Sequence, residues 1–497
     1  MKFDNRPLAE RDNHRRLDLP ETSPMSGLNR RSLGSCDVLA QSVGVIAPSG
    51  AAITIPALVI AITGAGALWA MAIALVLALL VATTINQFTV RVASVGSLYT
   101  FTAKGLGPTA AYLSGAGLIL GYGFVAVYAF ANVGLHAGEL AQSVVPATVP
   151  GPVIWACCIA VAAILCTVLL THRIAVSARI ALVAEIAAVT TVLVLGGVLL
   201  GRRGVHNIDW QALALPDVSA HQLILGSGLA LMALIGFESG AALSVEAKQP
   251  FATIPRALTS SLLATGALML VATATHPALA PQAENRASPL LSGLSDSYEV
   301  DGLAQLLDAA VVVSFFACAL ASVTALIRVL LSMSIDAVAP AWLGRIDRVS
   351  QVPRTPVYLV MPIVAVLPIV LLATADSTAD VLATVAIASV SGLVIAYLLV
   401  CLAAPAFLRK IGESTPRQTL LAVTAAAGLA TCLIVFFTSH GKNDNNRYIA
   451  MLLVCIALAA AVGLRVLSRR ADGIGTHDYP TRAEVLELEP ADRQGDS

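Results

Sequence analysis

GFESGAALSVEAKQPFATIPRA, residues 236–257, is the stretch that decides the fold. It continues the apolar run 223–235, yet it soon places Gly236, Glu238 and Gly240 where hydrocarbon is expected. A charge near the centre of a bilayer costs about 3 kcal/mol on insertion scales, and each glycine costs about 1 kcal/mol of helix stability. We therefore expect this segment to break a membrane helix and to face a cavity.

The composition is typical of a polytopic membrane protein. Of the 497 residues, 57% are hydrophobic and 12% charged, with a mean hydropathy of +0.82, whereas soluble domains carry about 25% charged residues. The formal net charge is zero and no basic block is present, so nucleic acid is not an expected partner. The eight cysteines lie at or inside apolar runs without CxxC spacing, so we expect them to be packing residues, with no disulfides and no metal.

Each membrane span needs about 20 apolar residues, and twelve such runs can be placed. They are 38–63, 67–88, 109–135, 153–170, 174–200, 223–244, 254–275, 303–333, 357–373, 381–408, 419–437 and 447–466. We therefore predict an all-α integral membrane protein with twelve spans, of which helices 1–10 form a core over 35–410 and helices 11–12 occupy 411–468. Residues 1–34, without a signal-peptide apolar region, and 469–497 are expected to be polar tails, and 278–302 a longer external loop.

The distribution of Lys and Arg predicts the orientation, because cytoplasmic segments retain these residues. If both tails are cytoplasmic, only five of the 30 fall on the far side. These five are Arg202, Arg203, Arg286, Lys442 and Arg447. An even number of spans agrees with this arrangement. The alanine-rich, lysine-poor composition favours a bacterial source, and hence the inner (plasma) membrane as the location.

The first span contains a second interrupted stretch, GVIAPSGAAITIPA, residues 44–57. Pro48 removes a backbone hydrogen bond and clashes with the preceding turn, and Ser49 and Gly50 are poor helix formers. A half-helix that begins near Ser49 would direct free N–H groups and a positive dipole end at a carboxylate. The alternative is a proline kink in a structural helix.

Spans one and six both break near mid-depth and lie five helices apart. Interrupted spans at corresponding positions of two halves indicate the binding site of a secondary transporter. Because each half has an odd number of helices, the second half would be inserted upside down. This pattern predicts two inverted five-helix repeats.

The stretch 236–257 resembles the signature of the amino acid, polyamine and organocation permease superfamily. The matching positions are Gly236, Phe237, Glu238, Glu246, Lys248, Pro250, Ile254, Pro255, Arg256 and Ala257. Residues 48–50, 98–108 and 328–343 are similar to other motifs of that family, and the resemblance spans roughly 35–410. It implies the LeuT-like fold, with broken helices 1 and 6, and alternating access by rocking of helices 1, 2, 6 and 7 against 3, 4, 8 and 9.

Several positions depart from the family pattern. Ile335 and Ala337 stand where the family commonly has Arg and Gly, Phe251 and Ala252 replace frequent basic residues, and Val245 replaces a frequent acid. These positions lie at the predicted cytoplasmic ends of helices six and eight, so the departures concern the cytoplasmic gate and its ion pairs. In the sixth helix, Met232 stands where some relatives place an aromatic over the substrate.

We expect the substrate to lie between the two breaks. N–H groups near Ser49 and Gly50 would hold a carboxylate, and carbonyls over 235–238 would hold an ammonium. The predicted binding residues are Gly44, Ala47, Pro48, Ser49, Gly50, Tyr122, Ile235, Gly236, Phe237 and Glu238. Tyr122 is included because its hydroxyl could bind the substrate. Its alternative role is packing in a structural stripe of aromatic residues.

Two acids and two hydroxyls are candidates for coupling. Glu238 could bind the ammonium, take up a proton, or brace the broken helix; burial would move its pKa upward. Glu185 could carry a proton or ion, since relatives place a coupling lysine about one turn later in the same helix, or it could bond a neighbouring helix. Ser322 and Thr324 could bind sodium or bond their own helix backbone. Protons are favoured over sodium as the coupling ion, and no cofactor is expected.

These features predict a secondary active transporter for an amino acid or related amine, embedded in a lipid bilayer. A small neutral amino acid is favoured, and a polyamine or organocation permease is the alternative. An enzyme is not expected, because the spans lack HExxH, GxSxG and paired catalytic carboxylates. A channel would lack the paired breaks. His136 and His172 are expected to face water, and the oligomeric state stays open.

Overall fold

The computed structural model describes residue 28 and residues 31–142, 148–171, 174–203, 218–279, 303–347, 352–438 and 444–467. Within these residues every extended regular element is a helix, apart from an isolated bridge between Leu33 and Ala247. The predicted tail 469–497 lies outside the described residues, as do most of the tail 1–34 and of the loop 278–302.

The helices follow one another along the chain with short connections. In order they are α2 (Ser35–Ile46), α3 (Pro48–Thr63), η2 (Gly64–Gly66), α4 (Ala67–Thr89), α5 (Leu98–Leu106), α6 (Pro108–Gln142), α7 (Gly151–Leu170), α8 (Ile174–Arg203), α9 (Ala220–Ala230), η5 (Leu231–Ala233), η6 (Phe237–Leu243), α10 (Pro250–Leu279), α12 (Leu303–Ile335), η8 (Ala341–Gly344), α13 (Arg354–Thr374), α14 (Thr378–Lys410), α15 (Pro416–Thr438) and α16 (Asp444–Leu467).

Eleven of the described helical runs are long and apolar enough to cross a membrane. This confirms an all-helical, multi-pass membrane protein. The first run, Ser35–Thr89, is 55 residues long and contains both of the first two predicted spans, 38–63 and 67–88. The count of twelve stays a prediction that depends on this run crossing twice.

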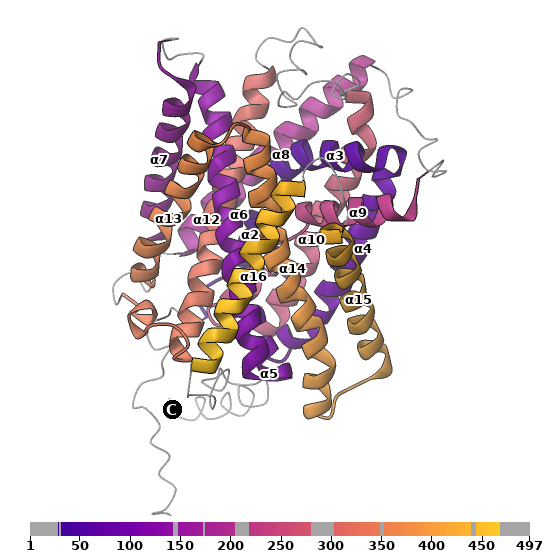
Figure 1. Cartoon of the computed structure of the whole chain (residues 1–497), viewed down its shortest axis with the longest axis vertical. Helices are drawn as coiled ribbons and strands as arrows, with labels where there is room; N and C mark the ends of the chain where they lie inside the picture. Colours follow the sequence, from indigo (N-terminus) through magenta and orange to yellow (C-terminus); the bar gives the residue numbers. More distant parts are fainter. Residues whose placement is uncertain are drawn as a thin grey trace, which may run out of the picture.

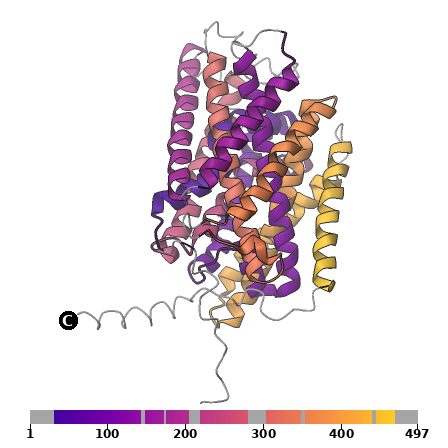
Figure 2. The same cartoon turned by 90° about the vertical axis from the view of Figure 1, so that its left-hand side faces the viewer.

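Three long helices form the centre of the bundle. In Figure 1, α6, α12 and α14 run along the long axis, and α6 packs against both of the others. Their small and aliphatic side chains belong to one continuous core. By contrast, α16 lies at the edge of the bundle in Figure 2 and is largely exposed, as expected for a helix that meets lipid rather than protein.

The first interruption lies at Ala47, between α2 and α3. Ala47 adopts a left-handed conformation (φ 52°, ψ 61°), and its N–H donates to the carbonyls of Val43 and Gly44, which closes α2. Pro48 then begins α3, at a position where the absent N–H of proline costs nothing. In Figure 1, α3 lies across the upper part of the bundle. The predicted break in this stretch is confirmed.

The second interruption lies at Gly236, between α9–η5 and η6. Its φ of 101° is one that L side chains rarely adopt, and a Cβ there would lie 2.3 Å from Cγ1 of Val45 in α2. Glycine is therefore required both by the backbone conformation and by the close approach of α2. The predicted break in the sixth span is confirmed, and the two breaks are in direct contact.

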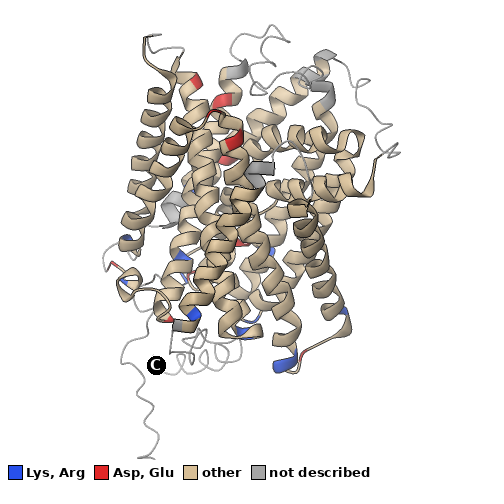
Figure 3. Cartoon of the chain, in the orientation of Figure 1, with Lys and Arg blue, Asp and Glu red and all other residues tan. Residues whose placement is uncertain are grey.

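Charged residues are distributed unevenly along the bundle. Figure 3 shows the described Lys and Arg mainly in its lower half, towards α5, while several Asp and Glu lie in the upper half. This asymmetry has the form that the positive-inside rule requires. The sidedness itself, with both tails in the cytoplasm, stays a prediction.

Ala337 adopts a left-handed conformation (φ 56°), which glycine adopts without the steric cost that a Cβ brings. The conformation costs an L residue about 1–2 kcal/mol, while the greater unfolded-state entropy of glycine opposes the exchange by about 0.5–1 kcal/mol. We expect Ala337→Gly to raise the midpoint of thermal unfolding in detergent slightly. Ala339→Gly, at a negative φ, is the control and is expected to lower it; a lower midpoint for Ala337→Gly would contradict this account.

Candidate functional site

The first residues of α3 are already bonded to a carboxylate. Oε1 of Glu185, in α8, accepts hydrogen bonds from the Ser49 N–H (2.8 Å), the Ser49 hydroxyl (2.9 Å) and the Ser314 hydroxyl (3.1 Å). The Gly50 N–H donates to Oγ of Ser314 (3.1 Å). Glu185, Ser49 and Ser314 are buried. The donors expected to hold a substrate carboxylate therefore do fit a carboxylate, but in this structure it is one of the protein's own.

The structure shows one of the two roles considered for Glu185, the bonding of neighbouring helices. Its proton or ion role stays a prediction. Ser314, in α12, was missed by the sequence analysis, because a serine inside an apolar helix has the same local pattern whether it bonds its own backbone or another helix. The second carboxylate oxygen, Oε2, is buried and has no hydrogen-bond partner among the described residues.

Glu238 lies just after the second break and is held by two tyrosines. The hydroxyl of Tyr122, in α6, donates to Oε1 (2.7 Å), and the hydroxyl of Tyr397, in α14, donates to Oε2. The Gly236 N–H in turn donates to the Tyr397 oxygen (3.1 Å). All four residues lie in the interior. The structure thus brings Tyr122 and Glu238 together, and it adds Tyr397, which the sequence analysis did not single out.

The remaining predicted binding residues flank these contacts. Gly44, Ala47 and Pro48 lie at the first break, and Ile235 and Phe237 lie at the second. The ring of Phe237 is buried and lies 5.7 Å from that of Tyr397, centroid to centroid. The end of α2 is held to its neighbours as well, because the Cys318 thiol donates to the Val45 carbonyl (3.2 Å).

Ser322 and Thr324, the two hydroxyls considered for sodium binding, make contacts that include neither Glu185 nor Glu238. Thr324 donates to the Leu320 carbonyl of its own helix (2.8 Å), which is the alternative role considered for it. Oγ of Ser322 lies 3.9 Å from Sγ of Cys318. Both side chains are buried in α12. A sodium role for them stays a prediction.

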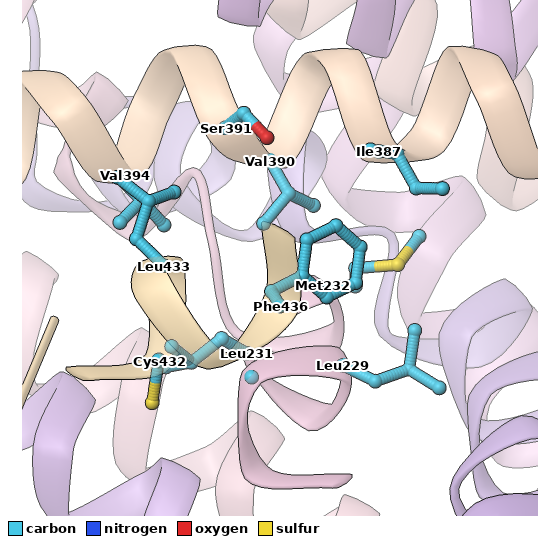
Figure 4. A pocket seen from close by; sticks show the side chains of 11 residues that line it. Leu229, Leu231, Met232, Ile387, Val390, Ser391, Val394, Cys432, Leu433 and Phe436 are labelled. Carbon is cyan, nitrogen blue, oxygen red and sulfur yellow. The ribbon is translucent and has the colours of Figure 1, made fainter. Parts of the chain in front are cut away.

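Met232 does not cover the site between the breaks. Figure 4 shows its side chain in a small apolar pocket, with Ile387 and Val390 of α14 and Phe436 of α15. The cavity volume there is about 30 Å³, and Ser391 is the one polar residue among those that line it. This space suits a methyl or methylene group rather than a zwitterion.

A buried ion pair connects the segment after η6 to α12. Nη2 of Arg328 lies 2.8 Å from Oε2 of Glu246, and both side chains are almost fully buried. Burial raises the pKa of Glu246, and the Arg328 guanidinium opposes that shift. The sequence analysis placed the ion pairs of the cytoplasmic gate in question, because five positions depart from the family pattern: Val245, Phe251, Ala252, Ile335 and Ala337. The pair Glu246–Arg328 is nevertheless formed.

One group among the described residues could hold a metal ion. Nδ1 of His136, in α6, lies 2.8 Å from Oδ1 of Asp308, in α12, and the carboxylate of Glu139 lies nearby, with the three ligand atoms within 4.8 Å of one another. His136 is buried, so the expectation that it faces water was wrong; its carboxylate partner comes from a distant part of the chain. His172 lies outside the described residues.

Two interrupted spans meet inside this all-helical membrane protein, and each lies beside a buried carboxylate. This arrangement defines a protein of the transporter class. The chain belongs to the amino acid permease family, whose model matches residues 37–440. This confirms the resemblance noted in the sequence.

Among curated proteins, the chain is similar to an uncharacterized transporter of Mycobacterium tuberculosis. The two are 27% identical over 412 residues, which cover 82% of this chain and 86% of the relative. A counterpart in Mycobacterium bovis matches equally. The chain is also similar to the vacuolar cationic amino acid transporter 4 of Arabidopsis thaliana, with 26% identity over 335 residues, or 65% of this chain and 56% of the relative.

The Glu246–Arg328 pair can be tested by removing one partner and then both. Glu246→Gln leaves a buried guanidinium without its counter-ion, which costs about 3–5 kcal/mol, so we expect a clear fall in the unfolding midpoint in detergent. The double variant Glu246→Gln/Arg328→Met is expected to recover much of this loss. Unchanged midpoints for both single variants, Glu246→Gln and Arg328→Met, would show that the pair does not stabilise the fold.

Proposed function

We propose that this permease is a secondary active transporter that moves an amino acid or related amine across the bacterial inner membrane by alternating access. The observation that carries the proposal is the contact between the two breaks, where Gly236 approaches Val45 and the N-terminus of α3 presents donors fitted to a carboxylate. We further propose twelve spans in a LeuT-like arrangement of two inverted five-helix repeats, with both termini in the cytoplasm.

In this proposal the α3 N-terminus binds the substrate carboxylate, and backbone carbonyls over 235–238 bind its ammonium. Glu185 must then release Ser49, because one set of donors cannot hold two carboxylates at once. A protonated Glu185 would release these donors more readily, since hydrogen bonds to a charged acceptor are roughly twice as strong as neutral ones. Proton uptake would thus favour substrate binding, which supports proton symport over sodium coupling.

The same geometry suggests which contacts change during the cycle. The ion pair Glu246–Arg328 joins the segment between helices six and seven to helix eight, and the hydroxyl of Tyr122 joins helix three to Glu238 in helix six. Both contacts cross the boundary between the proposed moving group (helices 1, 2, 6 and 7) and the proposed static group (helices 3, 4, 8 and 9). We propose that they close the site on one side and separate when it opens.

A second candidate is a permease for an amine or polyamine without a carboxylate. Such a substrate could leave Glu185 on Ser49 and use the negative charge of the site. No ion pair joins Glu185 or Glu238 to a Lys, Arg or His among the described residues. A relative named as a cationic amino acid transporter is in keeping with this alternative.

Transport by the purified protein in proteoliposomes tests the proposal directly. We expect saturable uptake of one labelled amino acid or amine, acceleration by unlabelled substrate inside, and stimulation when the outside is acidic. Amines and amino acids offered in parallel distinguish the two candidates. Uptake that neither saturates nor exchanges would indicate a channel and contradict the proposal.

Ser49→Trp tests the site at the first break. Its indole would occupy the space around the α3 N-terminus, so we expect uptake to fall at least tenfold while membrane insertion, measured by yield and monodispersity, is kept. Val423→Trp, on the exposed face of α15, is the matched control and should transport normally. Normal uptake by Ser49→Trp would count against the proposed site.

A further inference from the structure

Three side chains that can bind a metal ion meet where α6 and α12 pack together. His136 and Glu139 lie near the end of α6, and Asp308 lies near the start of α12. Nδ1 of His136 lies 2.8 Å from Oδ1 of Asp308. One carboxylate oxygen of Glu139 completes a set of three ligand atoms that all lie within 4.8 Å of one another. The function proposed above uses none of these residues.

The two helices hold the three side chains in fixed relative positions. His136 and Glu139 are three residues apart, so they share one face of α6. α6 packs closely against α12, and His136 and Asp308 are both buried. No local pattern indicated this cluster, because Asp308 is 172 residues away from His136 along the chain.

The cluster carries negative charge that no Lys or Arg neutralises. Glu139 and Asp308 are both acids, and neither forms an ion pair with a Lys or Arg among the described residues. His136 can offset at most one of the two charges, and only when it is protonated. Two carboxylates this close together repel each other when both are ionised. A divalent cation bound between them would remove this repulsion.

The distances fit a small tetrahedral ion. Zinc bonds a histidine nitrogen at about 2.0–2.1 Å and a carboxylate oxygen at about 2.0–2.2 Å, which places two ligands of a tetrahedral ion about 3.4 Å apart. The 2.8 Å between His136 and Asp308, and the upper limit of 4.8 Å for the whole set, lie on either side of this value. Because Glu139 is exposed, an ion can enter from its side, where a water molecule would supply a fourth ligand.

The kinds of ligand atom favour a transition metal over magnesium or calcium. Calcium takes about six to eight oxygen ligands, and magnesium requires about six in near-octahedral geometry. An imidazole nitrogen is a good ligand for zinc, copper, iron and nickel, whereas magnesium and calcium prefer oxygen ligands alone. One imidazole with two carboxylates therefore matches a divalent transition-metal ion.

We propose that His136, Glu139 and Asp308 bind a divalent transition-metal ion such as zinc, which links the end of α6 to the start of α12. The ion replaces the proton that Nδ1 of His136 shares with Asp308. A protonated imidazole releases this proton to solvent, and a neutral imidazole transfers it to Nε2, so that Nδ1 can bind the ion. This site does not depend on the proposed transport function.

The test is titration calorimetry of the purified full chain, without a polyhistidine tag, with zinc chloride. Magnesium chloride and calcium chloride are titrated in parallel. We expect one zinc ion to bind per chain and to raise the midpoint of thermal unfolding in detergent, while magnesium and calcium give no measurable heat at the same concentrations. Cobalt(II) in place of zinc is expected to give the strong visible absorption of a tetrahedral ion, which reports coordination directly.

Variants identify the ligands. Glu139→Gln and Asp308→Asn each keep the size of the side chain and are expected to weaken zinc binding at least about tenfold, since losing even an outer-shell partner can cost that much. Glu139 is exposed, so Glu139→Gln should unfold at the same midpoint as the unaltered chain when no metal is present. The matched controls are Glu413→Gln and Asp376→Asn, at exposed acids, and both should bind zinc normally.

The inference is overturned if zinc does not bind, or if Glu139→Gln or Asp308→Asn binds zinc like the unaltered chain. The second result would indicate adventitious binding elsewhere, for example at the exposed thiols of Cys36 and Cys157. Equal binding of magnesium or calcium would also overturn it, because it would indicate attraction to negative charge without coordination by His136.

Discussion

The hydrogen bonds between Glu185 and the N-terminus of α3 are the contacts on which the interrupted first span depends. A helix that begins inside a bundle leaves its first N–H groups without partners, and in a hydrocarbon layer no water supplies them. The Glu185 carboxylate accepts hydrogen bonds directly from the N–H and the hydroxyl of Ser49. It is linked to Gly50 through the Ser314 hydroxyl, which donates to the carboxylate and accepts from the Gly50 N–H. It also complements the positive end of the helix dipole. The break is thereby stabilised by one acid from a distant helix.

The second break follows the same physical rule with different groups. The Gly236 N–H donates to the hydroxyl of Tyr397, which in turn donates to one carboxylate oxygen of Glu238. The hydroxyl of Tyr122 donates to the other carboxylate oxygen. At both breaks, an acid and one or more hydroxyls replace the backbone carbonyls that an unbroken helix would have provided. Side-chain partners of this kind can be exchanged for a ligand, whereas the bonds of a continuous helix cannot. This is why such breaks suit a protein that binds and releases a solute inside the membrane.

The ends of the sixth and eighth predicted spans and the segments that follow them also contain a strained residue and a buried ion pair. Ala337 adopts a left-handed conformation, although it has a Cβ that glycine lacks. Glu246 and Arg328 form a buried ion pair beside Val245, an apolar residue. Each charge of this pair depends strongly on its partner because water is excluded from both side chains.

The sequence by itself determined the helices and the places where two of them break. Apolar runs specify spans, and the effects of Pro48 and Gly236 on the backbone are local, acting through a missing N–H and a missing Cβ. Only the tertiary structure decided that Glu185 meets Ser49, that Tyr397 meets Glu238, and that His136 is buried against Asp308. These partners are more than a hundred residues apart. A polar side chain in an apolar helix carries no local signal for its partner, because packing between helices chooses it.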